Sequence, residues 1–404
     1  MEILFFSQFY KPEAIAASFR ATDNAEYWAE AGNQVSVFTA YPNYPTGKVF
    51  YGYEVRLLSK QTLNGVKVYR SKLIIKANTN MLNRIENALS FFLYGIFNIL
   101  FNLNKVGKNY DVVLATSGTI FAALLGWFYS SVYSKPFVFE IRDLTYKQLI
   151  ATGKNKDSIT VKGMKFLEEF LCKRAKKVVV VTNGFKKILV DSGIPGAKIH
   201  VITNGVNVTN SQKDLKHIVT LSYYGTLGIS QNIVDTFQYA NVIKKIIDDF
   251  QYLIIGEGAQ KKLIEEEIRK CNYRDIKLMD GMSADELEKY YTYTNISVVT
   301  LKKSEDFKYT IPSKIFQIMG RGIAVLYIGP EGEAADIIRK YGAGIVLTGT
   351  VEEDLGKLAE FFLKNNWQDE LIKMGRNGSK AVLENYSRKK LAREYLNVLE
   401  EAAK

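Results

Sequence analysis

Residues 310–326 bring together side chains that are suited to binding an anion. Pro312 fixes the backbone angle φ and fits the first turn of a helix, and the hydroxyl of Ser313 can cap exposed N–H groups. Lys314 places a positive charge where the helix dipole already favours an anion, and Gln317 presents its amide one turn later on the same side. This spacing predicts a diphosphate site with a sugar hydroxyl next to it. A plain helix-to-strand unit with a solvated Lys314 would use the same residues, and the pattern alone leaves both interpretations open.

Two glycine-containing turns follow predicted strands in the same half of the chain. Gly225 lets the backbone approach a ligand closely, and Thr226 offers an N–H and a hydroxyl to a phosphate. Gly256 and Gly258 flank Glu257 at the end of another strand, but the further glycine and the ribose-binding acid of a dinucleotide fingerprint are missing. The turn at Gly225 is a weak signal when taken alone, and ordinary turn formation explains the turn at residues 256–258 equally well.

A charged pair follows a predicted strand in the first half. Arg142 and Asp143 come directly after residues 137–141, and the carboxyl ends of parallel strands line the crevice of an α/β domain. Since His200 and His217 both lie beside predicted strands, a histidine base is not expected, and Asp143 becomes the candidate for acid–base work or for binding a sugar hydroxyl. A buried ion pair between Arg142 and Asp143 is the structural alternative.

Composition narrows the function classes. A chain of 404 residues with 47% hydrophobic content can form two domains. Cys172 and Cys271 lack metal-ligand or disulfide spacing, and no signal peptide precedes the first strand, so a cytoplasmic protein without a metal is expected. The net charge of +12 comes entirely from residues 1–209. No nucleic-acid-binding motif accompanies it, which leaves an anionic lipid surface or a solvated basic face.

Apolar runs alternate with helical patterns along the chain, which is typical of parallel sheets. The strand-like runs are 34–39, 111–115, 137–141 and 177–181, followed by 217–224, 252–255, 276–279, 296–299 and 323–327. The polar segment 204–212 separates the two series and predicts a domain boundary. We therefore predict an α/β protein with two doubly wound domains.

One further apolar segment, residues 88–103, is shorter than the ~20 residues that a membrane-spanning helix needs. Basic residues flank it, namely Lys72, Lys76, Arg84, Lys105 and Lys108. A helix lying in the membrane interface and a helix buried against the first sheet both fit these residues.

In the order in which they occur, these motifs resemble those of family 4 glycosyltransferases of the GT-B fold. Residues 41–47 and 140–145 are more similar to the bacterial surface-polysaccharide branch that includes the L-fucosamine (N-acetylfucosamine) transferases. The acceptor-side loop, residues 8–20, also matches, although Ala14 and Ala16 replace the usual glycine pair. The resemblance implies two Rossmann-like domains facing a central cleft. Residues 1–209 would bind the acceptor, 210–386 would bind the nucleotide sugar, and the helix 387–404 would complete the first domain.

The resemblance also implies roles for individual residues. The nucleotide-sugar side would comprise Gly225, Thr226, Gly256, Gly258, Met282, Ser313, Lys314 and Gln317. The acceptor side would comprise Ala16, Arg20, Asn43 and Arg142, and the catalytic set Asp143, Lys314 and Glu333. The chain departs from the family at two positions, because Tyr309 and Gln317 stand where the family has glutamates. It also lacks the Arg or Lys that usually follows the turn at residues 223–228.

The activity implied is that of a retaining, metal-independent transferase. It would move a sugar, such as N-acetyl-L-fucosamine or another N-acetylated hexose, from a UDP-sugar to a polyprenyl-diphosphate-linked saccharide. The UDP-sugar is then a substrate, and no cofactor is expected. The enzyme would lie on the inner face of the cytoplasmic membrane. Two alternatives are a UDP-sugar epimerase of the same architecture and a basic binding protein with a vestigial active site.

Overall fold

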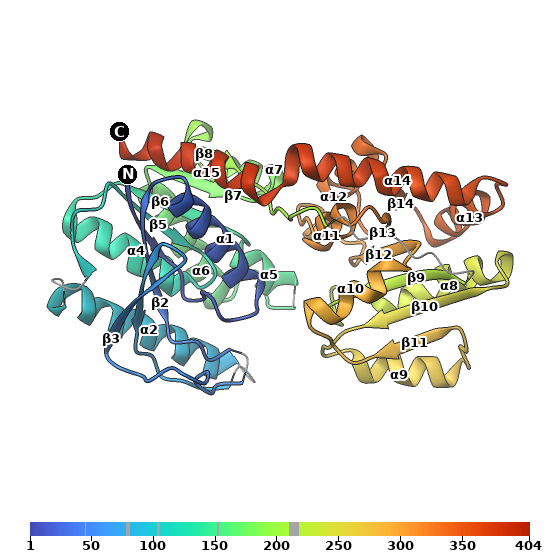
Figure 1. Ribbon diagram of the computed structural model, residues 1–404, viewed down its shortest axis with the longest axis horizontal. Helices are drawn as coiled ribbons and strands as arrows, with labels where there is room; N and C mark the ends of the chain where they lie inside the picture. Colours follow the sequence, from blue (N-terminus) through green and yellow to red (C-terminus); the bar gives the residue numbers. More distant parts are fainter. Residues whose placement is uncertain (45, 78–80, 103–105, 152, 210–217) are drawn as a thin grey trace. The chain divides into compact units, whose positions relative to one another are not determined.

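Two compact units make up the computed structural model, which describes residues 1–44, 46–77, 81–102, 106–151, 153–209 and 218–404 (Figure 1). Unit 1 contains Met1–Asn204 and Arg388–Lys404, and unit 2 contains Gly205–Ser387. The predicted boundary between residues 209 and 210 touches the segment 210–217. That segment, with His217, lies outside the described residues, as do Pro45 and Lys105.

Unit 1 is built around an eight-stranded sheet with the order β3-β4-β2-β1-β5-β6-β7-β8. The strands are β1 (Glu2–Phe6), β2 (Gln34–Ala40), β3 (Leu58–Leu63), β4 (Val66–Ser71), β5 (Val112–Thr116), β6 (Phe137–Ile141), β7 (Lys177–Val180) and β8 (Ile199–Val201). All neighbours are parallel except β3 and β4. Every residue of β5 and β6 is buried, which is why both strands appear in the sequence as nearly continuous apolar runs.

The antiparallel hairpin of β3 and β4 was not predicted from the sequence. Its turn consists of Asn64 and Gly65, whose φ angles of 47° and 79° are both positive, as a type I′ turn requires. An Asn-Gly pair is the strongest short-range signal for such a hairpin. The sequence therefore contained the information that places this sheet edge.

The helices of unit 1 are α1 (Ala16–Glu30), α2 (Met81–Phe101), α4 (Ile120–Tyr133), α5 (Thr145–Ala151), α6 (Ile159–Arg174), α7 (Asn183–Asp191), η1 (Gly196–Lys198) and α15 (Arg388–Ala403). Helices α1 and α15 pack together, and α4 contacts both α2 and α6. Although α15 is the last element of the chain, it belongs to unit 1 (Figure 1). Its carbonyl group at Ala392 accepts a hydrogen bond of 2.9 Å from the indole of Trp28, which is fully buried.

We expect Leu399→Ala to lower the stability of unit 1 by about 2–5 kcal/mol. Leu399 is fully buried in the cluster that α15 shares with β1, β2 and α1, so truncation leaves a cavity. Chemical denaturation followed by fluorescence measures the loss. Lys389→Ala, at an exposed position of the same helix, is the matched control and should change stability by less than about 0.5 kcal/mol. Equal effects of the two substitutions would contradict this account of α15.

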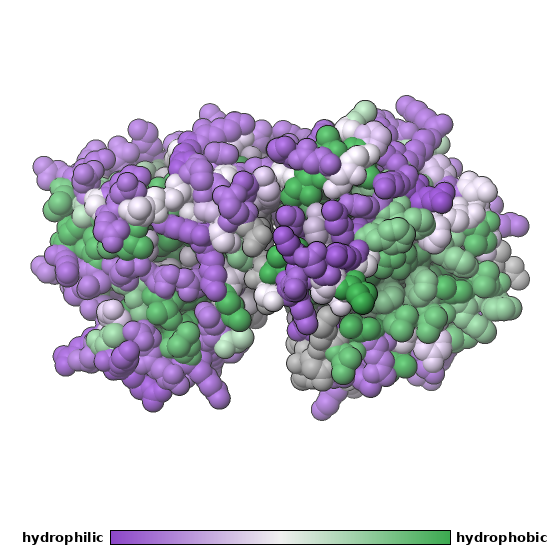
Figure 2. Space-filling view, turned by 180° about the vertical axis from the view of Figure 1, so that it is seen from behind, coloured by the Kyte–Doolittle hydropathy of each residue, from purple (hydrophilic) through white to green (hydrophobic). Residues whose placement is uncertain are grey.

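Helix α2 has one buried and one exposed face. Phe91 and Ile99 are fully buried, and a Cβ at Gly95 would lie 2.3 Å from Cδ2 of Leu125, so this face packs tightly on α4. The opposite face exposes large apolar side chains, namely Leu82, Ile85, Leu89, Leu93, Phe97, Leu100 and Phe101. In Figure 2 they form a broad hydrophobic area on unit 1, the lobe at the right. The buried face fits the interpretation of this segment as a helix packed inside the domain, whereas the interpretation as a membrane-interface helix stays a prediction. None of the described helices is long and apolar enough to cross a bilayer.

Unit 2 contains a six-stranded parallel sheet with the order β11-β10-β9-β12-β13-β14. Its strands are β9 (Val219–Tyr224), β10 (Phe250–Ile255), β11 (Ile276–Met279), β12 (Ile296–Thr300), β13 (Ala324–Ile328) and β14 (Gly344–Leu347). Its helices are η2 (Ile233–Asp235), α8 (Thr236–Ile246), α9 (Lys261–Lys270), α10 (Ala284–Thr292), η3 (Glu305–Phe307), α11 (Lys314–Gly320), α12 (Glu333–Tyr341), α13 (Val351–Phe362), α14 (Trp367–Ala381) and η4 (Val382–Tyr386).

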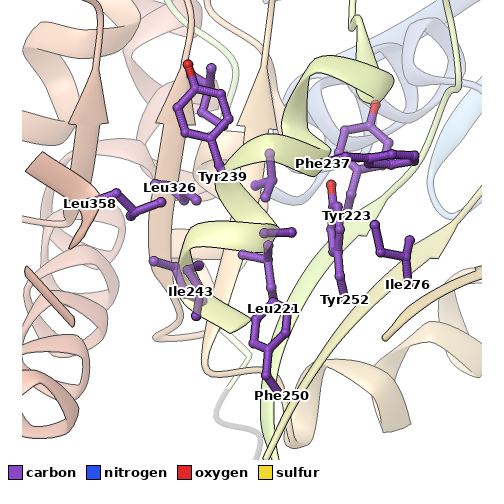
Figure 3. Close-up of a cluster of buried hydrophobic side chains, with 14 of the residues drawn as sticks. Leu221, Tyr223, Phe237, Tyr239, Ile243, Phe250, Tyr252, Ile276, Leu326 and Leu358 are labelled. Carbon is purple, nitrogen blue, oxygen red and sulfur yellow. The ribbon is translucent and has the colours of Figure 1, made fainter. Parts of the chain in front are cut away.

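One of the core clusters of unit 2 lies between its sheet and the helices α8 and α13, and another packs α11 and α12 against the sheet. Figure 3 shows Leu221 and Tyr252 of the sheet meeting Phe237 and Ile243 of α8, with Leu358 of α13 beside them. The side-chain hydroxyl of Tyr252, which is polar, forms a hydrogen bond of 2.9 Å with the hydroxyl of Thr236. Both units thus contain a sheet that is parallel, apart from the β3–β4 hairpin of unit 1, with helices packed on it, which confirms the predicted fold class of two Rossmann-like domains.

Candidate active site

The nucleotide-side candidates lie in loops at one edge of the unit 2 sheet. Gly225 and Thr226 follow β9, Gly256 and Gly258 follow β10, and Met282 follows β11, while Lys314 begins α11 after β12. The carboxyl ends of parallel strands share an edge, so these loops converge. Strand β9 lies between β10 and β12, where successive connections depart in opposite directions. Such a switch point is the usual ligand site of a doubly wound sheet.

Lys314 lies directly against the turn that follows β9. Its Nζ is 3.9 Å from the centroid of the Tyr223 ring and donates a hydrogen bond to the Tyr223 hydroxyl at 2.5 Å. A Cβ at Gly225 would come within 2.5 Å of the Lys314 Cε, and the φ of 132° at this residue also favours glycine. Glycine at position 225 therefore makes room for the lysine.

The electrostatic setting of Lys314 points to an anionic ligand. Burial lowers the pKa of its ammonium group to about 7, and no carboxylate in the described ranges forms an ion pair with it. Lys314 is half-buried by its accessible surface, and a partly desolvated lysine without a counter-charge lowers the stability of the free protein, so an anion would supply the missing charge. This geometry fits the diphosphate interpretation better than the solvated lysine.

Two details of the predicted anion site are wrong. Ser313 has φ −58° and ψ −22°, which are helical values, and its side chain forms no capping hydrogen bond. A capping serine needs an extended backbone, so Ser313 cannot turn its hydroxyl back onto the helix. The N–H of Gly225 donates a hydrogen bond to Ile255 O at 2.8 Å, so it is not available to bind a phosphate. Within the described chain, the N–H groups of Thr226 and Gly228 have no acceptor and remain available.

The two positions that depart from the family lie close to Lys314 in sequence. Gln317 is half-buried on α11, and its main-chain carbonyl oxygen accepts a hydrogen bond of 3.0 Å from Arg321. Tyr309 lies in the loop before α11, with Lys308 Nζ 5.2 Å from its ring centroid. Neither side chain carries a negative charge, so this part of the site cannot stabilise a cation as a glutamate would.

A further cation, Lys261, was missed by the sequence analysis. It is the first residue of α9, and its Nζ pairs with Glu257 Oε1 at 2.7 Å and with Asp280 Oδ1 at 2.5 Å. Glu257 also accepts the N–H of Gly281 at 3.2 Å, so the loops after β10 and β11 are tied together beside Met282. A lysine at a helix start directly after a glycine turn was the signal that could have found it.

Glu333 begins α12, the helix after β13. Together with Asp336 it places negative charge in the first turn, where the helix dipole stabilises it. A Cβ at Gly332 would lie 2.1 Å from Lys308 O, so this turn packs closely on the loop that carries Tyr309. Glu333 is thus brought to the same edge as Lys314.

Arg20, predicted for the acceptor side, is held by interactions inside unit 1. Its Nε donates to Glu140 Oε1 at 2.8 Å, and its two terminal nitrogens donate to Thr203 O at 2.8 Å and Ile202 O at 3.0 Å. Burial alone would raise the pKa of Glu140, but the charges of Arg20 and Arg142 outweigh it and lower that pKa. Arg20 therefore links residues 202–203, near the end of the first stretch of unit 1, to Glu140 of β6.

Arg142 and Asp143 lie in the loop between β6 and α5. No ion pair joins these two described residues, and the buried pair near them is the one between Arg20 and Glu140. Arg142 Nε is buried and has no hydrogen-bond partner among the described residues. The Asp143 side chain is exposed, yet the protein atoms that surround its carboxyl group raise its pKa. A raised pKa suits a carboxyl group that accepts a proton from an alcohol.

The loop that carries Asp143 is anchored by a buried glutamate. Glu168 of α6 accepts the N–H of Thr145, at the start of α5, at 2.8 Å. Burial raises the pKa of Glu168 to about 7. This contact fixes the end of the loop two residues after Asp143.

Asn43, the remaining acceptor-side candidate, lines a pocket of about 240 Å³ in unit 1 together with Gln8, Tyr44, Asn87 and Thr119. Ala16 begins α1. The structure thus places Asn43 at a cavity and Arg20 in a structural ion pair. In the described ranges, no group of three or more His, Cys, Asp and Glu residues is arranged to hold a metal ion.

Comparison with known proteins assigns each half of the chain. The model named Glycosyltransferase Family 4 matches residues 18–210, and the model named Glycosyl transferases group 1 matches residues 209–381. A protein of Escherichia coli K12 named as a colanic acid biosynthesis glycosyl transferase, WcaI, is 20% identical over 381 residues, which cover 90% of this chain and 86% of that protein.

Solved structures share the whole fold. The sucrose-phosphate synthase of Thermosynechococcus elongatus aligns with a TM-score of 0.71 at 14% identity and covers 99% of this chain and 98% of its own. HepE of Anabaena, solved in complex with UDP, aligns with a TM-score of 0.68 at 12% identity over 99% of this chain and 100% of its own. Since the two family models meet at residues 209–210 and leave only the chain ends unmatched, this protein is a glycosyltransferase of family 4, built on the GT-B fold.

Proposed function

We propose that the enzyme transfers a sugar from a UDP-sugar to a polyprenyl-diphosphate-linked saccharide during the assembly of a surface polysaccharide. The observation that carries the donor half is Lys314, a half-buried cation that no carboxylate among the described residues pairs with, beside the free N–H groups of Thr226 and Gly228. HepE, which has the same fold, binds UDP and UDP-glucose, and WcaI is named for polysaccharide biosynthesis. The two family matches favour transfer over the epimerase alternative.

In the proposed reaction, an acceptor hydroxyl oxygen forms a bond to the anomeric carbon of the donor while the bond from that carbon to the UDP oxygen breaks. Lys314 and the Thr226 N–H stabilise the negative charge that develops on the leaving diphosphate. Asp143 takes the hydroxyl proton, for which its raised pKa is suited. The anomeric configuration is retained, and the sugar is an N-acetylated hexose such as N-acetyl-L-fucosamine. Glu333 contacts the donor sugar.

Calorimetric titration with UDP, GDP and NAD tests the donor site. We expect selective binding of UDP, and at least a tenfold weaker Kd in Lys314→Ala, because a charge-assisted contact to phosphate contributes more than about 1.5 kcal/mol. Lys373→Ala, which removes an exposed lysine of α14, is the control and should leave the Kd unchanged. If the wild-type protein binds no nucleotide, the vestigial binding protein becomes the better explanation.

We also propose that the enzyme lies on the inner face of the cytoplasmic membrane and contacts it through the exposed face of α2. Leu82 and Phe101, near the two ends of this helix, are 77% and 71% exposed. Lys72, Lys76 and Arg84 lie next to the apolar face or precede it in the chain. An apolar stripe with basic residues beside it matches the interface of an anionic bilayer.

We expect the triple variant Leu82→Ser, Leu93→Ser and Phe97→Ser to lose most of its binding to liposomes of anionic lipid, while its melting temperature stays within a few degrees of wild type. Co-sedimentation at low and high salt measures binding. Leu363→Ser with Leu383→Ser, two equally exposed leucines of unit 2, is the control. Unchanged sedimentation of the triple variant would exclude α2 as the docking face.

A further inference from the structure

A chain of side-chain amides lines the pocket of unit 1. Thr119 Oγ1 donates to Gln8 Oε1 at 2.8 Å, Gln8 Nε2 donates to Asn87 Oδ1 at 2.7 Å, and Asn87 Nδ2 donates to Asn43 Oδ1 at 3.3 Å. The chain ends where Asn43 Nδ2 donates to Tyr41 O at 2.8 Å. These hydrogen bonds fix the orientation of every amide in the row.

Each of these amides retains unused hydrogen-bonding capacity. A carboxamide has two N–H donors and two acceptor lone pairs, and the bonds above use one of each in Gln8, Asn87 and Asn43. What remains is one donor and one acceptor per amide within the described part of the chain. A hydroxyl group can both donate to and accept from such a pair, whereas a carboxylate can only accept. The row is therefore complementary to a ring that carries neutral hydroxyl groups.

Aromatic side chains form another part of the wall. The rings of Phe9 and Tyr44 meet edge to face, with centroids 5.8 Å apart and an interplanar angle of 73°. Flat apolar rings beside hydrogen-bonding groups suit a pyranose, whose C–H faces are apolar and whose edge is polar. The volume of about 240 Å³ is below the usual 300–1,000 Å³ of ligand pockets, so one ring fits better than an oligosaccharide.

The two basic side chains that line the pocket differ in whether they form an ion pair. Lys76 is paired with Glu86 at 2.5 Å. Arg84 is exposed, and no ion pair in the described residues engages it. Arg84 lies on α2, next in sequence to Ile85 of the exposed apolar face. The same helix therefore contributes residues to the pocket, the guanidinium group of Arg84 and the apolar face.

We infer that this pocket binds the sugar ring that is attached directly to the lipid diphosphate. The amide row holds the hydroxyl groups of the ring, Arg84 binds the diphosphate, and the lipid chain leaves along the exposed face of α2. This inference rests on the proposed function and narrows it, because the acceptor is then a neutral monosaccharide on lipid diphosphate. The reaction that supplies this substrate must be the transfer of a sugar 1-phosphate from a nucleoside diphosphate sugar onto a polyprenyl phosphate, with release of a nucleoside monophosphate.

Saturation-transfer NMR of the full chain tests the pocket with the 1-phosphates of glucose, galactose and N-acetylglucosamine, together with methyl glucuronide. We expect at least one sugar 1-phosphate to bind and methyl glucuronide to give no signal. Asn87→Leu and Thr119→Val should each weaken the sugar 1-phosphate at least fivefold. Arg84→Gln should reduce its affinity to that of the corresponding methyl glycoside, whereas Arg56→Gln, at an exposed arginine of the same unit, should not change it.

Saturating UDP separates this site from the donor site. If the sugar 1-phosphate remains bound in the presence of UDP, the pocket belongs to the acceptor; its displacement by UDP would overturn the inference. So would binding that survives Asn87→Leu, or a failure of all three sugar 1-phosphates to bind. The Kd for UDP, measured on the same variants, should remain within twofold of wild type. A loss of UDP binding by the wild-type protein would instead count against the proposed function.

Discussion

Lys314→Met is expected to abolish measurable UDP binding and at the same time to stabilise the protein. In the wild type, burial lowers the pKa of Lys314 to about 7 from the ordinary lysine value of 10.5. Methionine has a similar length and no charge, so it fills the space beside Gly225 and Tyr223 without the cost of burying an ammonium group. Denaturation at pH 6 should show a gain on the order of 2–4 kcal/mol.

The pH dependence of this gain has a definite sign. Below pH 7, Lys314 is protonated in both the folded and the unfolded protein, and folding pays the full desolvation cost. Between about pH 7 and pH 10.5, only the unfolded state carries the proton, so the stability of the wild type rises with pH. The advantage of Lys314→Met should therefore shrink toward pH 10. A variant that is less stable than wild type at pH 6 would show that the contacts of the ammonium group with Tyr223 outweigh the cost of desolvating it.

Binding of UDP should also take up protons at pH 8. The diphosphate favours the charged form of Lys314 and raises its pKa, so a fraction of the lysines must gain a proton on binding. Titrations in two buffers with different ionisation enthalpies measure this uptake. Lys314→Arg, which is charged in both states, should bind without the uptake that Lys314 causes.

Arg20→Met is expected to cost about 3–5 kcal/mol of stability in unit 1, because it leaves Glu140 buried and unpaired. The lowered pKa of Glu140 means that the pair contributes stability above the pKa of an unfolded glutamate and loses it as pH falls through the folded value. The loss in Arg20→Met should therefore be largest near neutral pH and smaller in acid, where the isolated Glu140 becomes protonated.

The double variant Arg20→Met with Glu140→Leu distinguishes a structural role from acceptor binding. Replacing a buried ion pair by apolar side chains is often neutral, so the double variant should recover most of the lost stability. Arg56→Met, which breaks an exposed pair with Glu54, is the control and should change stability by less than about 1 kcal/mol. If a fully stable double variant no longer turned over the acceptor, the result would support the predicted role of Arg20 in acceptor binding.

The elements predicted best from the sequence are those with strong local patterns. The buried runs of β5 and β6 and the segment around Lys314 carry their information within a few residues. The interactions of Arg20 could not be predicted, because its partners Glu140 and Thr203 lie 120 and 183 residues away. The availability of the Gly225 N–H likewise depended on its pairing with Ile255, which only the register of β9 and β10 determines.

The ends of unit 2 meet within that unit. Val206 forms a parallel bridge with Ser387, and the N–H of Val206 donates to Tyr386 O at 3.0 Å. The first and last residues of the segment 205–387 therefore lie next to each other, as they do in a domain inserted into another domain. Helix α15, which follows this segment, completes unit 1. A segment with joined ends can be exchanged as one block between relatives. Under the proposed function, we expect such an exchange to change the nucleotide sugar that is used and to leave the proposed acceptor residues of unit 1 unaltered.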